Sequence, residues 1–555
     1  MKIRQDPEQL KIAQQIHDAF NEGVVDIFLE LPTGWGKSGC AYFAHNLTGY
    51  STAVLSHQKI LLDQYDNLLR NYACTVKGKA NYPCAIDGDV TVDQALCQFG
   101  YSCRDKENCE YFVQRILAPR AKFLNTTYQL VLSLLDTAIG FDLNKDLYIF
   151  DECHNLPAIF TDYRSVRLGS QDLVNYARIE AVCEKDPELL EVWESVEYAA
   201  HCIEEIDFNR IDESNFEEPF AKAFKAKAEL VALLEAKINK FGKSYDRDDR
   251  WIAKKLAQLH SFDSKSCCKH SNMQSFYGSV LENKEFVIEK KSFKDTWELQ
   301  VIPLKVNTMF PMVANTLAPR RIFMSATIFG VDRLRRELGL TKPFKFIGMP
   351  SKFDVENRRV YSIPVLNMNH TTISTGDLTP MYDSIQDICE MHLKEGDSGI
   401  IFTPSYNLSK MILDRIGSSL ERVGAIMLAN TSGADRDEIL NTFRDERIKK
   451  PKILISPSFF EGVNFENDYS RFQIISKVPF LSLGSKYVKT KMQLDQTWYS
   501  MEAIKSIVQA SGRSVRNESD YAMTYILDSN FNRVFGAYSQ YVPQWFKDAL
   551  LIKRG

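Results

Sequence analysis

A glycine-rich loop between an apolar strand and a helix constrains the fold of this chain more than any other feature. The loop is Leu31–Ser38, and it follows the apolar run Val25–Leu29. Further strand and helix patterns alternate after it, as in βαβ units. Because such units place successive strands parallel and cover them with helices, the sequence predicts an α/β protein built on parallel sheets.

The loop supplies the groups that phosphate binding requires. Gly34 and Gly36 let backbone N–H groups turn toward phosphate oxygens. Lys37 is placed to reach the β- and γ-phosphates, and the hydroxyl of Ser38 is placed to reach Mg²⁺. A chance Gly-Lys-Ser turn is the alternative, and the strand–loop–helix context disfavours it.

An acidic pair follows a second apolar strand, Asp146–Phe150. Asp151 and Glu152 are therefore expected at the carboxyl edge of the sheet, where ligands of parallel sheets bind. Asp151 would hold Mg²⁺, while Glu152 would orient and deprotonate the attacking water. Such a pair is weak alone, but together with the phosphate loop it predicts nucleotide hydrolysis.

Polar groups later in the chain complete this predicted site. Ser325 and Thr327 end another apolar strand, where a γ-phosphate sensor would lie. Gln509 precedes Arg513 and Arg516, which are three residues apart and would share one face of a helix. Arginines from a second domain stabilise transition-state charge and couple hydrolysis to domain closure. A surface basic helix is the alternative.

Four cysteines lie between the phosphate loop and the acidic pair: Cys84, Cys97, Cys103 and Cys109. Their spacing, with 12, 5 and 5 intervening residues, matches neither zinc ribbons nor ferredoxin-type runs. Four thiolates suit either zinc or an iron–sulphur cluster, and the absence of any metal is a third reading.

Aromatic side chains surround these cysteines. Phe99, Tyr101, Tyr111 and Phe112 are the nearest. Flat rings beside a single-strand channel can stack on bases. Packing is the commoner role for rings beside a metal module, and we favour it here.

The bulk numbers limit the remaining possibilities. A chain of 555 residues predicts roughly three to four domains, and a net charge of −4 confines any nucleic-acid contact to local patches. The N-terminus has no apolar secretory core, and the apolar runs are shorter than the ~20 residues of a membrane span. We therefore expect a cytoplasmic protein without membrane contact, in which thiols stay reduced.

A second α/β series follows a charge-rich, helix-like region. That region occupies residues 164–290, and an alternating hairpin at Glu285–Glu289 and Trp297–Val301 begins at its end. The second series is predicted from four strands: Gly399–Phe402, Ile453–Ser456, Phe472–Ile475 and Tyr521–Leu527.

Together these motifs resemble the iron–sulphur XPD/DinG branch of superfamily-two helicases, and most closely DinG. The matching segments run in order along nearly the whole chain: Gly34–Ser38, Ser56-His57, Asp151–His154, Ser325–Thr327, Phe402–Tyr406, Phe460–Phe465, Val478–Phe480 and Gln509–Arg516. In addition, Lys77–Cys84 resembles the entry to the DinG cluster, and Cys103–Tyr111 resembles its exit.

The resemblance implies two RecA-like motor domains that bind ATP and Mg²⁺ between them. It implies that Arg4 and Gln9 read the adenine, and that the four cysteines hold a 4Fe–4S cluster. It further implies 5′-to-3′ translocation on single-stranded DNA, unwinding of forked DNA and a role in DNA repair. A monomer is expected. The domains are expected as motor domain one at 1–71, 114–163 and 301–345, the iron–sulphur module at 72–113, a helical arch at 164–300, and motor domain two at 346–555.

Three positions depart from the family pattern. Asn464 stands where Asp is usual, Lys352 where Pro is usual, and Asn530 where an Arg commonly follows Asp528. These departures keep a DNA-stimulated translocase without robust unwinding as an alternative. An RNA-directed motor is a further alternative, because the motifs do not report on the 2′-OH. A non-catalytic nucleic-acid scaffold with structural zinc is another.

Overall fold

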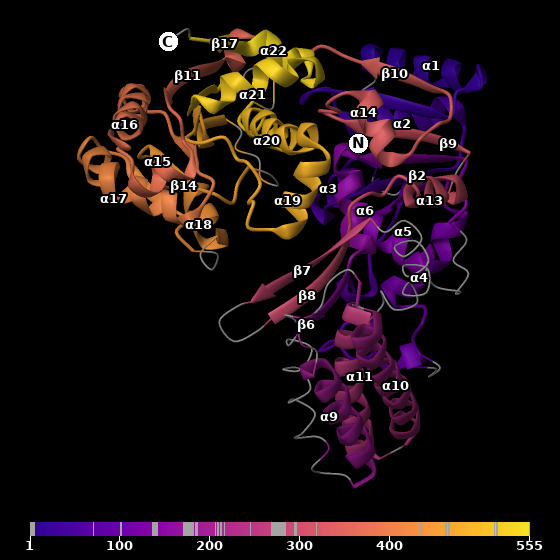
Figure 1. The fold of residues 1–555 in the computed structure, drawn as a ribbon. Coiled ribbons are helices and arrows are strands. Elements are labelled where there is room, and N and C mark those ends of the chain that lie inside the picture. The colour runs from indigo at the N-terminus through magenta and orange to yellow at the C-terminus, as the bar shows by residue number, and fades with distance from the viewer. Residues whose placement is uncertain are drawn as a thin grey trace.

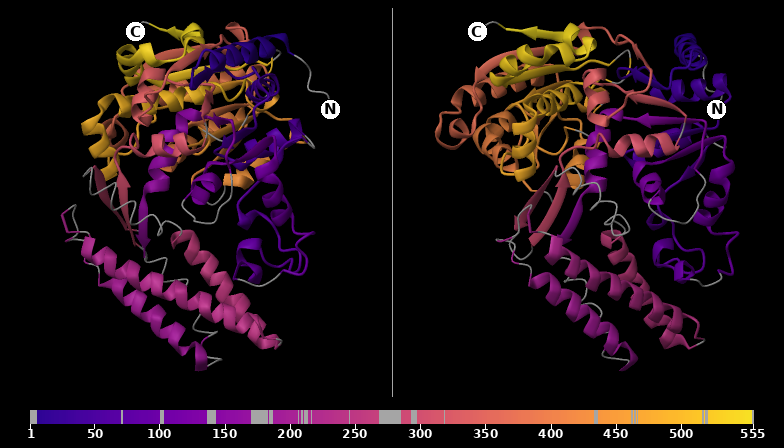
Figure 2. Two further views of the ribbon diagram at one scale, coloured as in Figure 1. Left: turned by 90° about the vertical axis from the view of Figure 1, so that its right-hand side faces the viewer. Right: turned by 45° about the vertical axis from the view of Figure 1, so that its right-hand side comes forward.

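Two sheet-centred units lie side by side, and a helical extension projects away from them (Figures 1 and 2). The computed structural model describes every residue except 1–5, 70–71, 100–102, 136–142, 170–182, 184–186, 206, 208–209, 211–213, 216, 245, 268–284, 293–296, 318, 433–435, 461–462, 464, 466, 516, 518–519 and 554–555. Arg4, Tyr101, Asn464 and Arg516 therefore lie outside the described residues.

The first unit, motor domain one, is built on a seven-stranded sheet in the order β10-β1-β9-β5-β2-β4-β3. All its pairings are parallel, which confirms the predicted sheet type. Several strands are buried along their whole length, as expected where helices cover both faces. The strands are β1 (Asp26–Glu30), β2 (Thr52–Ser56), β3 (Cys74–Val76), β4 (Phe123–Thr127), β5 (Leu147–Asp151), β9 (Arg320–Ser325) and β10 (Phe344–Gly348).

Helices cover this sheet on both faces (Figure 1). They are α1 (Pro7–Asn21), α2 (Lys37–Thr48), α3 (Lys59–Leu68), α5 (Tyr128–Leu135), α6 (Leu156–Arg164), α13 (Met309–Leu317) and α14 (Val331–Leu338). The sheet takes in β3 and the whole of β10, so it extends past the expected boundaries at 71 and 345.

The second unit, motor domain two, has a seven-stranded parallel sheet in the order β13-β14-β12-β15-β16-β11-β17. The four predicted strands are all present, with ends within two residues of those expected. The strands are β11 (Val360–Leu366), β12 (Gly399–Phe402), β13 (Ile426–Ala429), β14 (Lys452–Ser456), β15 (Phe472–Ile475), β16 (Met523–Asp528) and β17 (Leu550–Ile552). The helices are α15 (His370–Thr375), α16 (Thr379–Lys394), α17 (Tyr406–Arg422), α18 (Arg436–Phe443), α19 (Lys486–Leu494), α20 (Gln496–Ser511), α21 (Asn530–Tyr538) and α22 (Gln544–Ala549).

The helical extension contains α9 (Leu190–Glu204), α10 (Glu217–Gly242) and α11 (Arg247–Cys267). At its root lies an antiparallel sheet of β6 (Val166–Gly169), β8 (Trp297–Pro303) and β7 (Phe286–Ser292), so the predicted hairpin is present. The root also touches motor domain two, because Glu289 Oε1 accepts a 2.8 Å hydrogen bond from the backbone N–H of Lys486 in α19.

The cysteine-bearing segment between β3 and β4 packs against this extension. It contains short turns, η1 (Lys79–Asn81), η2 (Val92–Gln94) and η3 (Leu96–Phe99), followed by α4 (Glu110–Leu117). Its own buried core is small, and Phe99 is buried instead in the core of the helical extension. An ion pair of 2.8 Å joins Asp87 to Lys254 of α11. The segment and the extension thus share a core. No helix among the described residues is long and apolar enough to cross a membrane.

Candidate active site

A cavity of about 600 Å³ lies between the two motor domains. Motor domain one contributes the phosphate loop, His57, Gln58, Glu152, His154 and Thr327 among others. Motor domain two contributes Arg436, Leu440, Arg444, Val463, Val508, Gln509, Gly512, Arg513 and Trp545. The cavity therefore brings together segments as distant in the sequence as Pro32 and Trp545.

The phosphate loop requires its glycines. Gly34 has φ +93°, and an added Cβ would lie 2.3 Å from the ring of Phe353. Gly36 has φ +67° at the N-cap of α2, and an added Cβ would lie 2.7 Å from Nε2 of Gln9. Both positions therefore combine a left-handed backbone with a close neighbour, and only glycine meets both conditions.

Gln9 reaches the loop from α1. Its Nε2 donates a 2.7 Å hydrogen bond to the backbone oxygen of Trp35, inside the loop. The Gln9 amide therefore lies against the loop. Its contact with adenine stays a prediction, and Arg4 is outside the described residues.

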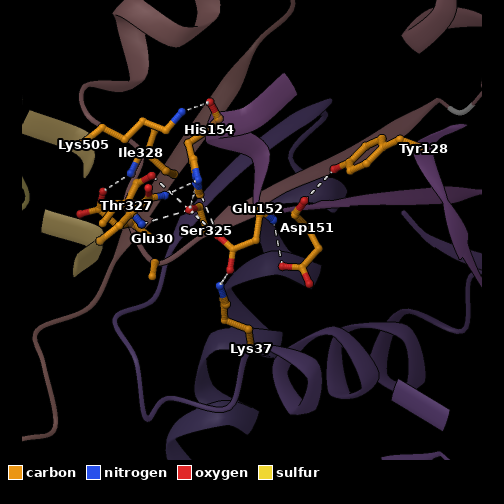
Figure 3. Close-up of polar contacts among 12 residues, drawn as sticks. Glu30, Lys37, Tyr128, Asp151, Glu152, His154, Ser325, Thr327, Ile328 and Lys505 are labelled. Carbon is orange, nitrogen blue, oxygen red and sulfur yellow. Dashed lines mark hydrogen bonds and ion pairs between the residues drawn. The ribbon is translucent and has the colours of Figure 1, made fainter. Parts of the chain in front are cut away.

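The ammonium of Lys37 pairs with Glu152 at the centre of the site (Figure 3). Burial by itself would raise the pKa of Glu152, but the Lys37 charge, assisted by His154 and by hydrogen bonds, lowers it to about 2. Burial raises the pKa of Asp151 to about 6, against the attraction of Lys37. Glu152 has φ +50°, a strained conformation that is found mainly at functional sites.

A relay of hydrogen bonds runs from Gln509 of motor domain two to this carboxylate, and Figure 3 shows its His154, Ser325 and Glu152 members. The side-chain Nε2 of Gln509 lies 2.7 Å from Nε2 of His154, and His154 Nδ1 lies 2.6 Å from Oγ of Ser325. Ser325 Oγ in turn donates to Glu152 Oε2 at 3.1 Å. Because burial lowers the pKa of His154 to about 3, the imidazole is neutral. The network then places its proton on Nδ1 and leaves Nε2 to accept from Gln509.

The segment after Ser325 is held from both domains. Glu30, at the end of β1, accepts a 2.8 Å hydrogen bond from the backbone N–H of Ile328. Burial raises the pKa of Glu30 to about 7. From motor domain two, the indole N–H of Trp545 donates to the backbone oxygen of Ala326 at 3.3 Å.

The motor domain two wall differs from the sequence prediction. Helix α20 ends at Ser511, so Arg513 lies in the turn after the helix and not on its face. Its Nε and Nη1 donate to the backbone oxygens of Phe460 and Val463, at 3.2 and 3.4 Å. Arg516 lies outside the described residues, so its position relative to Arg513 is not described.

Two further arginines, which were not predicted from the sequence, line the cavity. Arg436, Leu440 and Arg444 follow one another at intervals of four residues in and just after α18, so they share one face. The guanidinium of Arg436 lies 5.0 Å from the ring centroid of Phe459. This spacing was a readable signal, although nothing local linked it to the phosphate loop.

The four cysteines carry free thiols in one module. Burial raises the pKa of Cys97, and so do the neighbouring thiols of Cys103, Cys84 and Cys109. Within the part of the chain that the structure describes, no group of three or more His, Cys, Asp or Glu side chains is arranged to hold a metal ion. By their chemistry, four soft thiolate donors suit an iron–sulphur cluster or zinc.

The aromatic side chains of this module pack. Phe99 is buried against the helical extension, and Tyr111 is buried with its ring 5.6 Å from that of Tyr82. A stacking role for these two rings would require their exposure.

Asn530 is one of the three positions that depart from the family pattern, and the structure describes it. Its Nδ2 donates to Asn367 Oδ1 at 2.7 Å and to Asp528 Oδ1 at 3.0 Å.

Two protein families match segments of the chain. A helicase C-terminal domain matches residues 388–549, and the family described as DEAD_2 matches residues 87–173. The first match covers most of motor domain two. The second begins in the cysteine module and includes the acidic pair.

Curated relatives are similar over most of this chain. The ATP-dependent DNA helicase DinG of Photobacterium profundum is 21% identical over 505 residues, which cover 80% of this chain and 71% of the relative. The ATP-dependent DNA helicase CHL1 of Kluyveromyces lactis is 21% identical over 533 residues, which cover 83% of this chain and 61% of the relative.

Solved structures share the fold. An XPD helicase structure superimposes with a TM-score of 0.63 at 12% identity, covering 99% of this chain and 100% of the other. The structure of S. tokodaii Xpd4 gives 0.58 at 14% identity, covering 99% and 100%. The two parallel sheets, both family matches and the relatives agree, and together they support an XPD/DinG-type superfamily-two helicase.

Proposed function

We propose that the protein is an ATP-dependent DNA helicase that hydrolyses ATP in the cavity between its motor domains. One observation carries this proposal: the cavity joins the phosphate loop and Glu152 on one wall to Gln509 and Arg513 on the other. Hydrolysis in such a site depends on closure of the two domains, and closure moves the bound strand.

Because Lys37 pairs with Glu152, the basicity of Glu152 should depend on whether a nucleotide is bound. When phosphate oxygens take the ammonium of Lys37, Glu152 loses the charge that lowers its pKa. Its pKa then rises toward the ordinary range, and Glu152 becomes a better acceptor for the proton of the attacking water. Ser38 and Asp151 are oxygen donors that would hold Mg²⁺, which supplies charge neutralisation at the phosphates when bound.

The relay gives motor domain two a direct effect on this carboxylate. Gln509 moves with motor domain two, and its hydrogen bond to His154 orients the imidazole against Ser325. Ser325 then holds the second oxygen of Glu152. Closure therefore sets the direction of Glu152, while Arg513 and Arg516 would stabilise the charge that develops on the phosphates.

Translocation from 5′ to 3′ and a 4Fe–4S cluster on the four cysteines are finer parts of the proposal. The free thiols around Cys97 and the small core of their module support the cluster, because a metal centre would cross-link a segment with little core of its own. Anaerobic purification with iron and sulphide analysis, repeated on Cys103→Ser, tests it. A colourless, iron-free wild type that unwinds DNA would refute the cluster, and zinc in its place would support the alternative metal.

A strand-displacement assay tests the activity itself. Partial duplexes with a 5′ or a 3′ single-stranded tail, in DNA and in RNA, are incubated with ATP and Mg²⁺, and Lys37→Ala is the inactive control. We expect displacement only from the 5′-tailed DNA. Displacement only from a 3′ tail would overturn the polarity, and ATP hydrolysis without displacement would support the translocase alternative.

A further inference from the structure

The linker that joins the two motor domains is fastened to the phosphate loop. It follows β10, and its first residues pass over Trp35, the aromatic residue inside the loop. The indole N–H of Trp35 donates a 2.6 Å hydrogen bond to the backbone oxygen of Pro350. Trp35 is only 2% exposed, so the loop and the linker share a buried contact.

Lys352 strengthens this contact from the linker side. Its ammonium lies 4.2 Å from the centroid of the Trp35 ring. The same ammonium pairs with Asp6 at 3.1 Å and with Glu8 at 2.7 Å. A cation held over an indole by two carboxylates is a favourable arrangement, and the side chain is 18% exposed, which limits screening by water.

The two carboxylates belong to the start of α1, which also carries Gln9. Asp6 caps this helix by accepting from the backbone N–H of Glu8 at 2.9 Å. One turn later, the amide of Gln9 donates to the backbone oxygen of Trp35. Trp35 is therefore held at three points, by Pro350, by Lys352 and by Gln9.

The next linker residue closes the same unit. The ring of Phe353 lies where a Cβ on Gly34 would be, so it packs directly on the loop. The phosphate loop, the start of α1 and the linker thus form one connected unit. From the linker, Lys352 contacts both the phosphate loop and the start of α1.

We propose that Lys352 is a positioning residue for nucleotide binding, which acts through Trp35 to fix the phosphate loop and the amide of Gln9 against the inter-domain linker. The inference rests on the proposed function, because it assumes that the loop binds ATP.

The test measures the equilibrium binding of ATP with Mg²⁺ by the full-length protein. In Lys352→Met the aliphatic stem remains but the charge is lost, and we expect the Kd for ATP to rise about fivefold to tenfold. Lys352→Arg retains a cation for the ring and the carboxylates and should restore binding to within about twofold. Lys342→Met removes an equal charge from an exposed site upstream and is the matched control.

A steady-state measurement separates positioning from general damage. Lys352→Met should raise KM for ATP while kcat at saturating ATP changes far less, because Lys352 lies in the linker and does not line the cavity. It should also narrow the preference for ATP over GTP, because Gln9 is oriented through the Trp35 carbonyl. Equal binding in Lys352→Met and Lys342→Met would overturn the inference.

Trp35→Phe provides an independent variant, should Lys352→Met fail to fold. It keeps a ring under the ammonium but removes the hydrogen bond to Pro350, and we expect a Kd increase of about threefold. An unchanged Kd there would count against the inference. If the wild type binds no ATP, or Lys37→Ala binds as well as the wild type, the proposed function itself fails. If both behave as proposed and the Lys352 and Trp35 variants are silent, only the inference fails.

Discussion

The two walls of the cavity are built in different ways. On the motor domain one side, Lys37, Asp151 and Glu152 lie at the sheet edge, where Asp151 is buried and the half-buried Lys37 and Glu152 pair with each other. On the motor domain two side, Arg513 lies in a turn and Arg436 at the start of a helix, and the guanidinium of Arg513 is bound to backbone carbonyls. On the first wall, the opposite charges of Lys37 and Glu152 pair with each other. On the second wall, the guanidinium of Arg513 donates to backbone carbonyls.

The two walls are therefore expected to respond differently when a nucleotide binds. Phosphates can replace Glu152 as the partner of Lys37 without rearrangement of the sheet edge. Nε and Nη1 of Arg513 already donate to the backbone oxygens of Phe460 and Val463, so a phosphate would compete with these carbonyls for the guanidinium. Binding should therefore depend mainly on the first wall, and the catalytic step on both walls in the closed state.

The largest expected effect is that of a substitution on the first wall, Glu152→Gln, on the rate of ATP hydrolysis. Glu152→Gln removes the base but not the shape of the side chain, so the hydrolysis rate should fall by about 10³- to 10⁴-fold. ATP binding should be retained, because Lys37 loses a competing negative partner. Rapid-quench and equilibrium-binding measurements check both parts, with Lys37→Ala as the variant that loses binding. A kcat within tenfold of the wild type would show that Glu152 is not the base.

The second largest expected effect is that of a substitution on the motor domain two wall. Arg513→Ala should lower kcat for hydrolysis by about 10³-fold, as expected for an arginine supplied by a second domain. KM for ATP should change by less than about threefold, because the first wall is intact. Steady-state kinetics with saturating single-stranded DNA check this contrast. A large rise in KM at constant kcat would place Arg513 in ground-state binding and erase the proposed difference between the walls.

The first wall could be predicted from the sequence, and most of the second could not. Lys37 and Glu152 follow apolar strands, so local pattern and the geometry of parallel sheets fix their place. Arg436, Arg444 and Trp545 enter the cavity only because separate segments fold together, and no local pattern reports that. The linker contacts of Lys352 are equally long-range.

The error at Arg513 has a local cause. Gly512 follows Ser511 directly, and helices commonly end at glycine. The arginine spacing suggested one helical face, but the glycine was the stronger signal. The strands that were predicted, such as β5, β12 and β15, were predictable because buried parallel strands read as continuous apolar runs. Strands β13 and β17 were not predicted.

A smaller effect tests the connection between the walls. Gln509→Ala removes the donor to His154 Nε2, and a lost hydrogen bond of this kind should lower kcat by about tenfold. Because the relay begins in motor domain two, stimulation of hydrolysis by single-stranded DNA should fall more than the basal rate. ATPase assays with and without DNA measure this ratio. An equal fall in both rates would mean that the relay supports Glu152 without transmitting closure.

The smallest effect concerns stability behind the first wall. Burial raises the pKa of Glu30 to about 7 from an ordinary 4.5, so the folded protein binds more protons than the unfolded chain between these values. Stability from this group is therefore complete at acid pH and is lost as pH rises through about 7. Glu30→Gln is neutral at every pH and keeps a carbonyl oxygen for the Ile328 N–H.

Glu30→Gln should therefore match the wild type near pH 4.5 and exceed it above pH 7, by roughly 2–3 kcal/mol in the free energy of unfolding of motor domain one. Thermal unfolding midpoints across this range measure the difference, with Glu22→Gln as an exposed control. Parallel curves for wild type and variant would mean that the carboxyl of Glu30 is as well solvated in the folded state as in the unfolded chain. The hydrogen bond from the backbone N–H of Ile328 to Glu30 would then hold the segment after Ser325 without any cost from burying the Glu30 charge.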